Sequence, residues 1–238
     1  MLQRACQSVT LADVGKERLL APLWHTRLLL LLLLAVPATA LTLHGGSVAP
    51  ASSTASRIIV VYAPLLVTST GLALYVCRLG LAGWCERELL GKNWFAPDTA
   101  ALDVALAALL TVALIAVETA LTSVAGLPQS LASHALVART SVERWLWLPL
   151  ATTIGISEEL VYRGYLQRQL TAISQSAGLG IVAQALLFGI AHGEQGGSAV
   201  LRFALYGAAF GWLARSRRSL LPCMLSHVAI DSLSGLGA

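Results

Sequence analysis

ISEELVYRG, residues 156–164, places three charged side chains inside an apolar segment that spans residues 145–166. The charged residues are Glu158, Glu159 and Arg163. An ionised side chain near the centre of a membrane helix costs about 2.5–3.5 kcal/mol on insertion scales. Such charges are tolerated where they face a polar cavity and have partners. The segment therefore predicts a reactive site inside a membrane protein.

The composition also indicates a membrane protein. Of the 238 residues, 56% are hydrophobic and 12% are charged, and the mean hydropathy is +0.73. Soluble domains carry about a quarter charged residues. Because a span needs about 20 apolar residues, we expect an all-α, polytopic transmembrane helix bundle of about seven spans, with a range of about six to eight. The apolar runs are 27–43, 58–77, 100–124, 145–166, 176–191, 199–214 and 220–236.

The basic residues predict the orientation of this bundle. Eleven of the 16 fall on the side that holds the N-terminus, four fall on the other side, and Arg163 lies within a span. An excess of Lys and Arg marks the cytoplasmic side, so we expect an integral, multi-pass membrane protein with a cytoplasmic N-terminus. The net charge of +4 is spread over the membrane edges and gives no reason to propose a nucleic acid partner.

We divide the chain into three parts. Residues 1–27 are a cytoplasmic N-terminal segment, residues 28–144 are N-terminal transmembrane helices, and residues 145–238 are a transmembrane core that holds the candidate site. The first apolar run contains seven consecutive leucines and is followed by Ala38-Thr39-Ala40, as in a secretory signal with its cleavage site. Its leading region is longer than usual at about 27 residues, so we expect an uncleaved first helix.

The spacing of the three charged residues separates their roles. On a helix, Glu159 and Arg163 lie four positions apart and share a face, where they can form an ion pair. Glu158 stands beside them without such a partner, which makes it the candidate general base. The alternative is a structural ion pair that orients two helices, with Ser157 as the N-cap of a helix that begins at the glutamates.

Two histidines follow in equally apolar segments. His192 comes four residues after Phe188, so the two rings are expected on one helix face. His227 and Asp231 have the same spacing, which suits an Asp–His hydrogen bond that sets the imidazole tautomer. A single buried histidine is more often a satisfied core residue. Three such pairs on three spans point instead to groups that converge inside a bundle.

The order Glu-Glu-x-x-x-Arg, Phe-x-x-x-His, His-x-x-x-Asp resembles the CPBP family of intramembrane proteases. That family includes the CAAX prenyl endopeptidases, which trim prenylated proteins, and bacterial relatives associated with bacteriocin self-protection. The resemblance covers the region from about residue 145 to the C-terminus, as a CPBP-like catalytic core, and does not extend to the three N-terminal spans. It implies an intramembrane endopeptidase whose partners are the lipid bilayer and a membrane-associated protein or peptide substrate, which can be prenylated.

The resemblance also implies roles for the matching residues. Glu158 corresponds to the catalytic carboxylate, and Glu159 and Arg163 complete the first motif. His192 corresponds to a residue that assists water activation or binds metal, and His227 with Asp231 to a pair that binds metal or stabilises the oxyanion. Many relatives carry Asn at the last position. An ionised Asp231 can only accept hydrogen bonds, which makes an oxyanion-donor role less suitable.

Two mechanisms remain open from the sequence. Glu158, His192 and His227 could hold one zinc ion as a His₂Glu set, with Asp231 supporting His227 and Glu159 acting as base. Without a cofactor, Glu158 and His192 would deprotonate water while His227 polarises the scissile carbonyl. No His-Glu-x-x-His helix is present, so we expect the cofactor-free route.

One geometric difficulty accompanies this interpretation. The predicted spans place Glu158 and His192 about 15 Å apart in depth, at about 1.5 Å per residue. Three explanations stay open: other span boundaries, tilted helices, or a broken helix. In the third, the tract from Pro149 to Ser157, with Gly155 inside it, starts a new helix near Ser157 and brings the glutamates to a helix N-terminus.

Two other classes of function use similar residues. A transporter or proton relay also buries Glu, His and Asp groups, but we find no paired half-helices in repeated halves. A catalytically inactive scaffold would not need every motif residue. The remaining polar residues receive no assigned role: Asp103 near the start of a helix, Glu118 in the middle of a span, His25, His44 and His134 in solvated loops or edges, and the unpaired Cys6, Cys77, Cys85 and Cys223.

Overall fold

The computed structural model describes residues 18–44, 53–81, 90–91, 93–94, 96–128 and 137–237, with side chains from 36 to 44 and from 79 to 81 left aside. These residues form helices and no strand, so the expected all-α class is confirmed for the described part of the chain. Expectations for Cys6, Cys85 and His134, and for the side chain of His44, lie outside the described residues.

Helices occupy each of the seven apolar runs. The first three runs become α1 (Leu23–His44), the continuous helix α2–η2–α3 (Thr54–Arg57, Ile58–Tyr62 and Ala63–Leu81), and α5 (Ala100–Ser123). The fourth run becomes α7 (Ser141–Glu159), the π-helix η3 (Leu160–Leu166) and α8 (Gln167–Ser174). The last three runs become α9 (Ala177–Ala191), α10 (Gly197–Arg217) and α11 (Leu221–Leu236), with the short turn η4 (Gly193–Gln195) after α9.

Fewer helices qualify as membrane spans than we expected. Among the described residues, two helices are both long and apolar enough to cross a membrane, Thr54–Arg78 and Ala100–Ser123. Few of their residues are buried inside the protein, as expected for surfaces that contact lipid. The helices that carry the motifs fall short because they are shorter or contain several charged residues, so the count of about seven spans is not confirmed.

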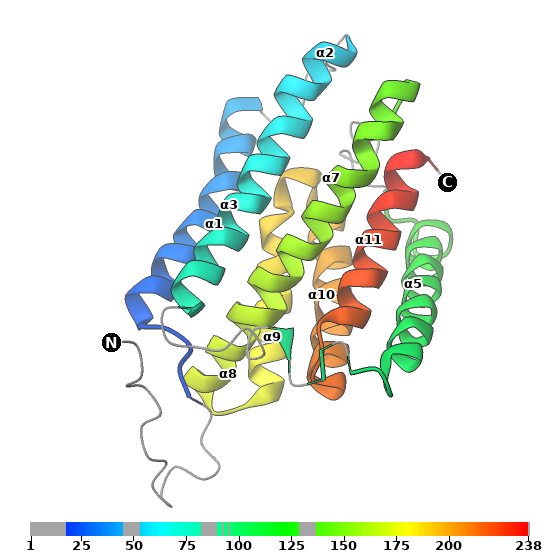
Figure 1. Ribbon diagram of the computed structural model, residues 1–238. Coiled ribbons are helices and arrows are strands. Elements are labelled where there is room, and N and C mark those ends of the chain that lie inside the picture. Colours follow the sequence, from blue (N-terminus) through cyan, green and yellow to red (C-terminus); the bar gives the residue numbers. More distant parts are fainter. Residues whose placement is uncertain are drawn as a thin grey trace, which may run out of the picture.

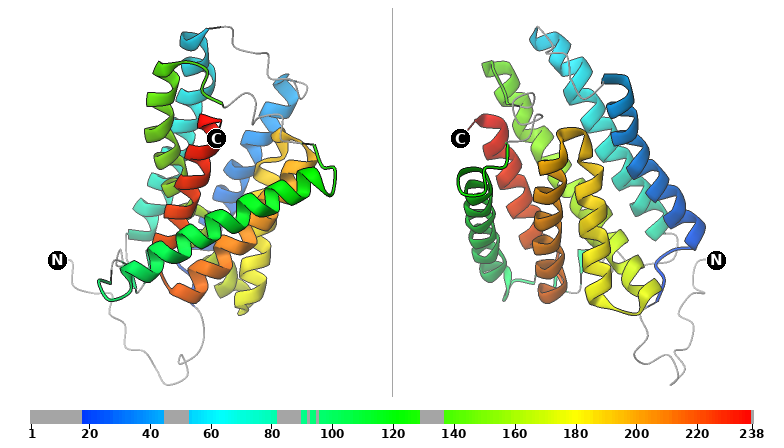
Figure 2. Two further views of the ribbon diagram at one scale, coloured as in Figure 1. Left: turned by 90° about the vertical axis from the view of Figure 1, so that its right-hand side faces the viewer. Right: turned by 180° about the vertical axis from the view of Figure 1, so that it is seen from behind.

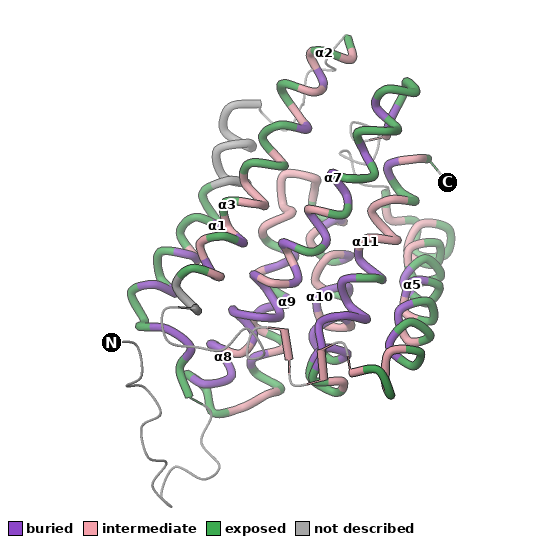
Figure 3. The backbone as a smooth tube through the Cα atoms, viewed as in Figure 1, coloured by how far each residue is buried: buried purple, intermediate pink, exposed green. Residues whose placement is uncertain are grey.

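The helices pack around a core formed by the C-terminal half of the chain. α7 lies beside α11 and α3, and α9 lies beside α10 (Figure 1). Figure 2 shows α5 on the outside, running alongside α10 and obliquely across α11, while α1 and α3 cover the opposite side. Buried residues gather along the facing sides of α7, α10 and α11, and exposed residues cover the outer face of α5 (Figure 3).

Of the alternatives considered for the fourth span, the helix break between Pro149 and Ser157 is wrong. α7 continues through Pro149 to Glu159 and passes directly into η3. Gly155 serves helix packing, because a Cβ built on it would lie 2.9 Å from Cγ2 of Val228 on α11. The absence of a side chain at this position lets the two motif-bearing helices approach closely.

Two ion pairs attach α5 to α10. Arg217 Nε lies 2.7 Å from Asp103 Oδ1, and Arg202 Nη1 lies 3.2 Å from Glu118 Oε1. The two acidic residues are as far apart along α5 as the two arginines are along α10, and the earlier acidic residue pairs with the later arginine. The two helices therefore run antiparallel. Glu118, which has no partner near it in the sequence, therefore has one across the bundle, and Tyr206 also donates a hydrogen bond to it at 3.3 Å.

The expectation that His25 is solvated is wrong. Its side chain is buried, stacks on Tyr75 and hydrogen-bonds through Nδ1 to the Tyr165 hydroxyl at 2.9 Å. Beside it, Gln169 of α8 accepts a hydrogen bond from the amide of Leu20 at 2.7 Å. The segment before α1 is therefore held against η3 and α8, because its polar groups find buried partners there.

Candidate active site

Glu159 and Arg163 form a fully buried ion pair. Arg163 Nη1 lies 2.8 Å from Glu159 Oε1, and both side chains have zero exposure, so the pairing expected from their spacing is confirmed. The guanidinium carbon lies 4.4 Å from the ring centroid of Phe188 and 5.1 Å from that of Phe210. These aromatic faces stabilise the cation where, among the described residues, its Nε and Nη2 have no hydrogen-bond partner.

Glu159 also fixes the orientation of His227. The imidazole Nδ1–H donates a hydrogen bond to Glu159 Oε1 at 2.8 Å. The same oxygen therefore accepts from Arg163 and from His227. We expected Asp231 to hold this imidazole, but Asp231 Oδ2 lies 3.6 Å from Nε2, beyond hydrogen-bond distance. The carboxylate that orients His227 comes from α7 rather than from its own helix.

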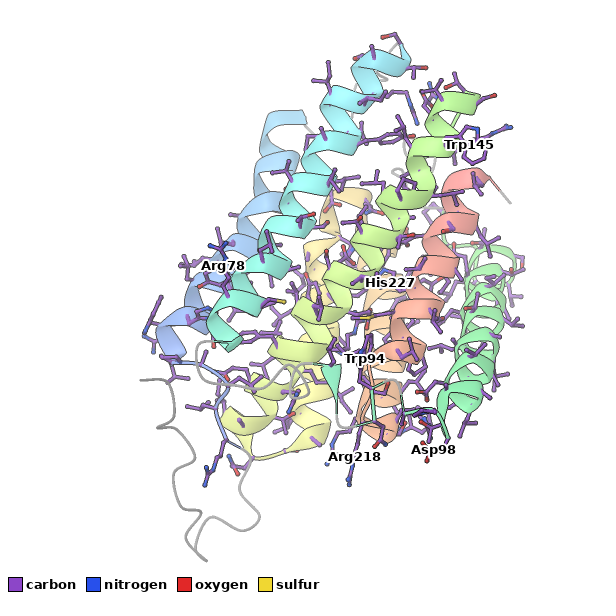
Figure 4. All side chains as sticks on the ribbon, viewed as in Figure 1. Arg78, Trp94, Asp98, Trp145, Arg218 and His227 are labelled. Atoms are coloured by element: carbon purple, nitrogen blue, oxygen red, sulfur yellow. The ribbon has the colours of Figure 1, made fainter. Side chains whose placement is uncertain are left out.

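The second nitrogen of His227 faces two more accessible carboxylates. Glu158 Oε2 and Asp231 Oδ2 each lie 3.6 Å from His227 Nε2. The side chains of Glu158 and Asp231 are 21% and 26% exposed, whereas that of Glu159 is fully buried. Figure 4 shows His227 in the middle of the bundle, where α11 faces α7. Glu158 and Asp231 are thus the carboxylates of this site that water or a substrate can reach.

His192 ends α9 with one nitrogen engaged. Its Nδ1–H donates to the carbonyl of Phe188 at 2.7 Å, since a carbonyl can only accept. In the neutral ring, Nε2 then carries a lone pair and can accept a proton or a hydrogen bond. The ring packs edge-on against Phe188 at 4.7 Å, which confirms the expected contact, and it stacks on Phe203 of α10 at 3.9 Å.

Phe188 brings the three motifs together. Its ring contacts Tyr162 at a centroid distance of 4.8 Å, His192 at 4.7 Å and His227 at 6.1 Å, all edge-on. His227 in turn lies against Glu158. Residues from η3, α9 and α11 therefore surround one aromatic ring, and His227 is the residue that lies between this ring and Glu158.

Sequence reasoning missed the contributions of α10 and η4. Phe210 stacks on His227 at 5.3 Å, as Phe203 stacks on His192. Their seven-residue spacing places the two rings on one face of α10, which is a signal that the sequence contains. Glu194 of η4 has a buried Oε2 without a hydrogen-bond partner among the described residues, and no motif marks it.

The zinc alternative requires three side chains placed close enough together to bind one ion. Within the described ranges, no three His, Cys, Asp or Glu side chains are grouped so that they could hold a metal ion. Glu158, His192 and His227 therefore do not form a ready His₂Glu set in this conformation. The expected cofactor-free route stays a prediction, and elemental analysis of the active protein would test it.

Comparison with known proteins identifies the region that holds this site. No curated protein and no solved structure matches the chain significantly. Residues 140–233 match the family model described as type II CAAX prenyl endopeptidase Rce1-like. The matched residues include every helix from α7 to α10 and most of α11. The family together with the apolar helices fits an integral membrane protein. Residues 140–233 are thus a domain of the Rce1-like family of CAAX prenyl endopeptidases, which are peptide hydrolases of the CPBP type.

Proposed function

We propose that this protein is an intramembrane endopeptidase that hydrolyses a peptide bond in a membrane-associated, prenylated CAAX-type protein or peptide. The observation that carries the proposal is the arrangement at His227. One imidazole nitrogen is held by the buried Glu159–Arg163 pair, and the other faces the accessible Glu158. An oriented imidazole beside a reachable carboxylate is an arrangement that can activate water and stabilise the resulting oxyanion.

In the proposed reaction, Glu158 takes a proton from a water molecule as the water oxygen attacks the scissile carbonyl carbon. His192 Nε2 accepts the second hydrogen bond of that water, because its Nδ1–H is already committed to Phe188. The carbonyl π electrons move to the oxygen and form a tetrahedral oxyanion. His227 Nε2–H donates a hydrogen bond to this oxyanion when the ring carries both protons. Glu158 then returns its proton to the amide nitrogen as the C–N bond breaks, which releases an amine and a carboxylic acid.

The membrane arrangement is part of the proposal. We infer a multi-pass protein of about seven spans with a cytoplasmic N-terminus, supported by the apolar helices and by the distribution of basic residues. A site among helices suits a substrate that arrives from the bilayer, and a prenyl chain would hold such a substrate there. The competing transporter or proton-relay function is not favoured, because the matched family hydrolyses peptide bonds.

The experiment that tests this function measures peptide cleavage by the purified protein in lipid nanodiscs. The probes are an internally quenched farnesylated CAAX peptide and the same peptide without the farnesyl group, with mass spectrometry of the products. We expect wild type to cleave the farnesylated peptide faster, and Glu158→Gln to abolish cleavage, because the isosteric amide cannot accept the proton.

A matched control removes a carboxylate elsewhere. Asp98 lies exposed before the start of α5 (Figure 4), so Asp98→Asn should cleave at the wild-type rate. Wild-type cleavage by a folded Glu158→Gln protein would contradict the proposed mechanism. Absence of any cleavage by wild type with either peptide would contradict the proposed function itself.

A further inference from the structure

The hydroxyl of Tyr162 differs from the other tyrosine hydroxyls of the described chain. Those of Tyr165, Tyr206 and Tyr75 are hydrogen-bonded, and that of Tyr62 is fully enclosed. The Tyr162 ring is buried, at 4% exposure, yet its hydroxyl has no hydrogen-bond partner among the described residues and is not one of the enclosed unpaired atoms. The hydroxyl therefore borders a space that water or a substrate can enter.

The position of the ring identifies that space. Tyr162 lies on η3, four residues after Glu158, and packs edge-on against Phe188 at 4.8 Å. The same Phe188 ring contacts His192 and His227. Glu158, one helical turn before Tyr162, lies 3.6 Å from that same His227. The hydroxyl thus belongs to the site of the three motifs, although no motif assigns it a role.

The proposed reaction needs hydrogen-bond donors, and few side chains of this site can donate. A tetrahedral oxyanion is stabilised by donors held in place before the reaction. The carboxylates of the site can only accept hydrogen bonds when ionised; they are Glu158, Glu159 and Asp231. Arg163 is fully buried in its ion pair with Glu159. His227 can contribute one donor through Nε2. A second donor with an accessible hydrogen is available in the phenol of Tyr162, which donates while staying neutral.

We propose that Tyr162 is a catalytic residue that donates a hydrogen bond from its hydroxyl to the oxyanion of the tetrahedral intermediate. This role rests on the proposed peptidase function. The ring is held by Phe188 on one side, and the Arg163 guanidinium carbon lies 5.8 Å from its centroid. These contacts fix the phenol before substrate binds, so little reorganisation is needed when negative charge develops on the carbonyl oxygen.

The test is the Tyr162→Phe variant, which keeps the ring and its packing and removes the donor. With the farnesylated peptide, we expect kcat to fall by about 10²–10³-fold while KM stays near the wild-type value, as for loss of one oxyanion donor. The control is Tyr206→Phe, which removes a hydroxyl that donates to Glu118 of α5, and which should keep the wild-type kcat. Thermal unfolding in the same nanodiscs checks that both variants fold.

A second measurement separates an oxyanion donor from a structural or base-tuning role. A farnesylated peptide with a phosphinate in place of the scissile amide mimics the tetrahedral intermediate, so its inhibition constant should rise by the factor that kcat/KM falls. The cleaved product peptide should inhibit Tyr162→Phe and wild type equally. A wild-type kcat in Tyr162→Phe, or a reduced kcat with unchanged phosphinate inhibition, would overturn this role.

The two proposals fail in different ways. If wild type and Tyr162→Phe cleave equally while Glu158→Gln is inactive, the peptidase function stands and the role of Tyr162 is wrong. If wild type does not cleave the farnesylated peptide, the proposed function is wrong and the role of Tyr162 is wrong with it.

Discussion

Glu159 and His227 are joined by a 2.8 Å hydrogen bond across 68 positions of sequence. Because Arg163 occupies the same carboxylate oxygen, Glu159 is committed to orienting its neighbours and is sealed from water. This position does not suit the role of base that the zinc mechanism would require of it. Glu158, which is partly exposed and faces the other nitrogen of His227, suits that role better.

The first prediction concerns the buried ion pair. Arg163→Ala strands the Glu159 carboxylate in the protein interior, and breaking a buried pair costs about 3–5 kcal/mol. We expect a lower free energy of unfolding in detergent titrations and a loss of activity, since His227 is no longer held. Glu159→Gln should be milder, because the amide oxygen can still accept a hydrogen bond from His227.

A double-mutant cycle checks that the two residues act together. If Glu159 and Arg163 are partners, the combined Glu159→Gln and Arg163→Met variant should lose less stability than the sum of the single variants. Additive losses would show that the pair does not interact in the folded protein.

The sequence could predict the Glu159–Arg163 pair, but it could not predict that His227 also bonds to Glu159. Glu159 and Arg163 lie on one helix, so their spacing determines whether they meet. The partner of His227 depends on how closely α11 approaches α7, and that approach depends on Gly155, which leaves room for Val228. Asp231 was the nearer acceptor in sequence, yet packing between the helices presents Glu159 to Nδ1 instead.

Contacts between residues far apart in the sequence could not be predicted outside the site either. The length of each apolar run predicted the position of each helix, because helix formation depends on local sequence and on burial of apolar side chains. The partner of Glu118 and the burial of His25 depend on contacts with Arg202 and Tyr165 far along the chain. Neither is visible in a local pattern, and both polar residues were therefore assigned no role.

The second prediction concerns the aromatic rings of α10. Phe203 stacks on His192 with an angle of 19° between the rings, and Phe210 stacks on His227 with an angle of 12°. Such contacts contribute about 0.5–1.5 kcal/mol each. Phe203→Leu and Phe210→Leu should therefore each lower kcat/KM by up to about tenfold, as the imidazoles lose a fixed orientation. Trp212→Leu is the control, since Trp212 is exposed on the same helix, and an equal loss there would contradict a specific effect.

The third prediction concerns the attachment of α5. Asp103 is buried against Arg217, whereas the side chain of Glu118 is 36% exposed beside Arg202. Asp103→Asn should therefore reduce the unfolding free energy more than Glu118→Gln, since Glu118 is partly solvated and Arg202 keeps its hydrogen bonds to backbone carbonyls when Glu118 is replaced. Activity per folded molecule should stay at the wild-type value in both variants. A larger loss in Glu118→Gln would indicate that the outer pair holds α5 in place.

The last prediction decides between the two mechanisms. In the cofactor-free route, protein stripped of metal keeps its cleavage activity, because Glu158 and His192 activate water without an ion. His192→Ala should then be nearly inactive, and His227→Ala should keep part of its activity after losing about 10²–10³ in rate, as for one oxyanion donor. If zinc is required, one tightly bound ion per active chain should copurify, a chelator should inactivate the protein reversibly, and each histidine variant should lose the ion. Elemental analysis of wild type and both variants, alongside cleavage of the farnesylated peptide, distinguishes these results. Stoichiometric zinc that disappears in both variants would reassign Glu158 from base to ligand.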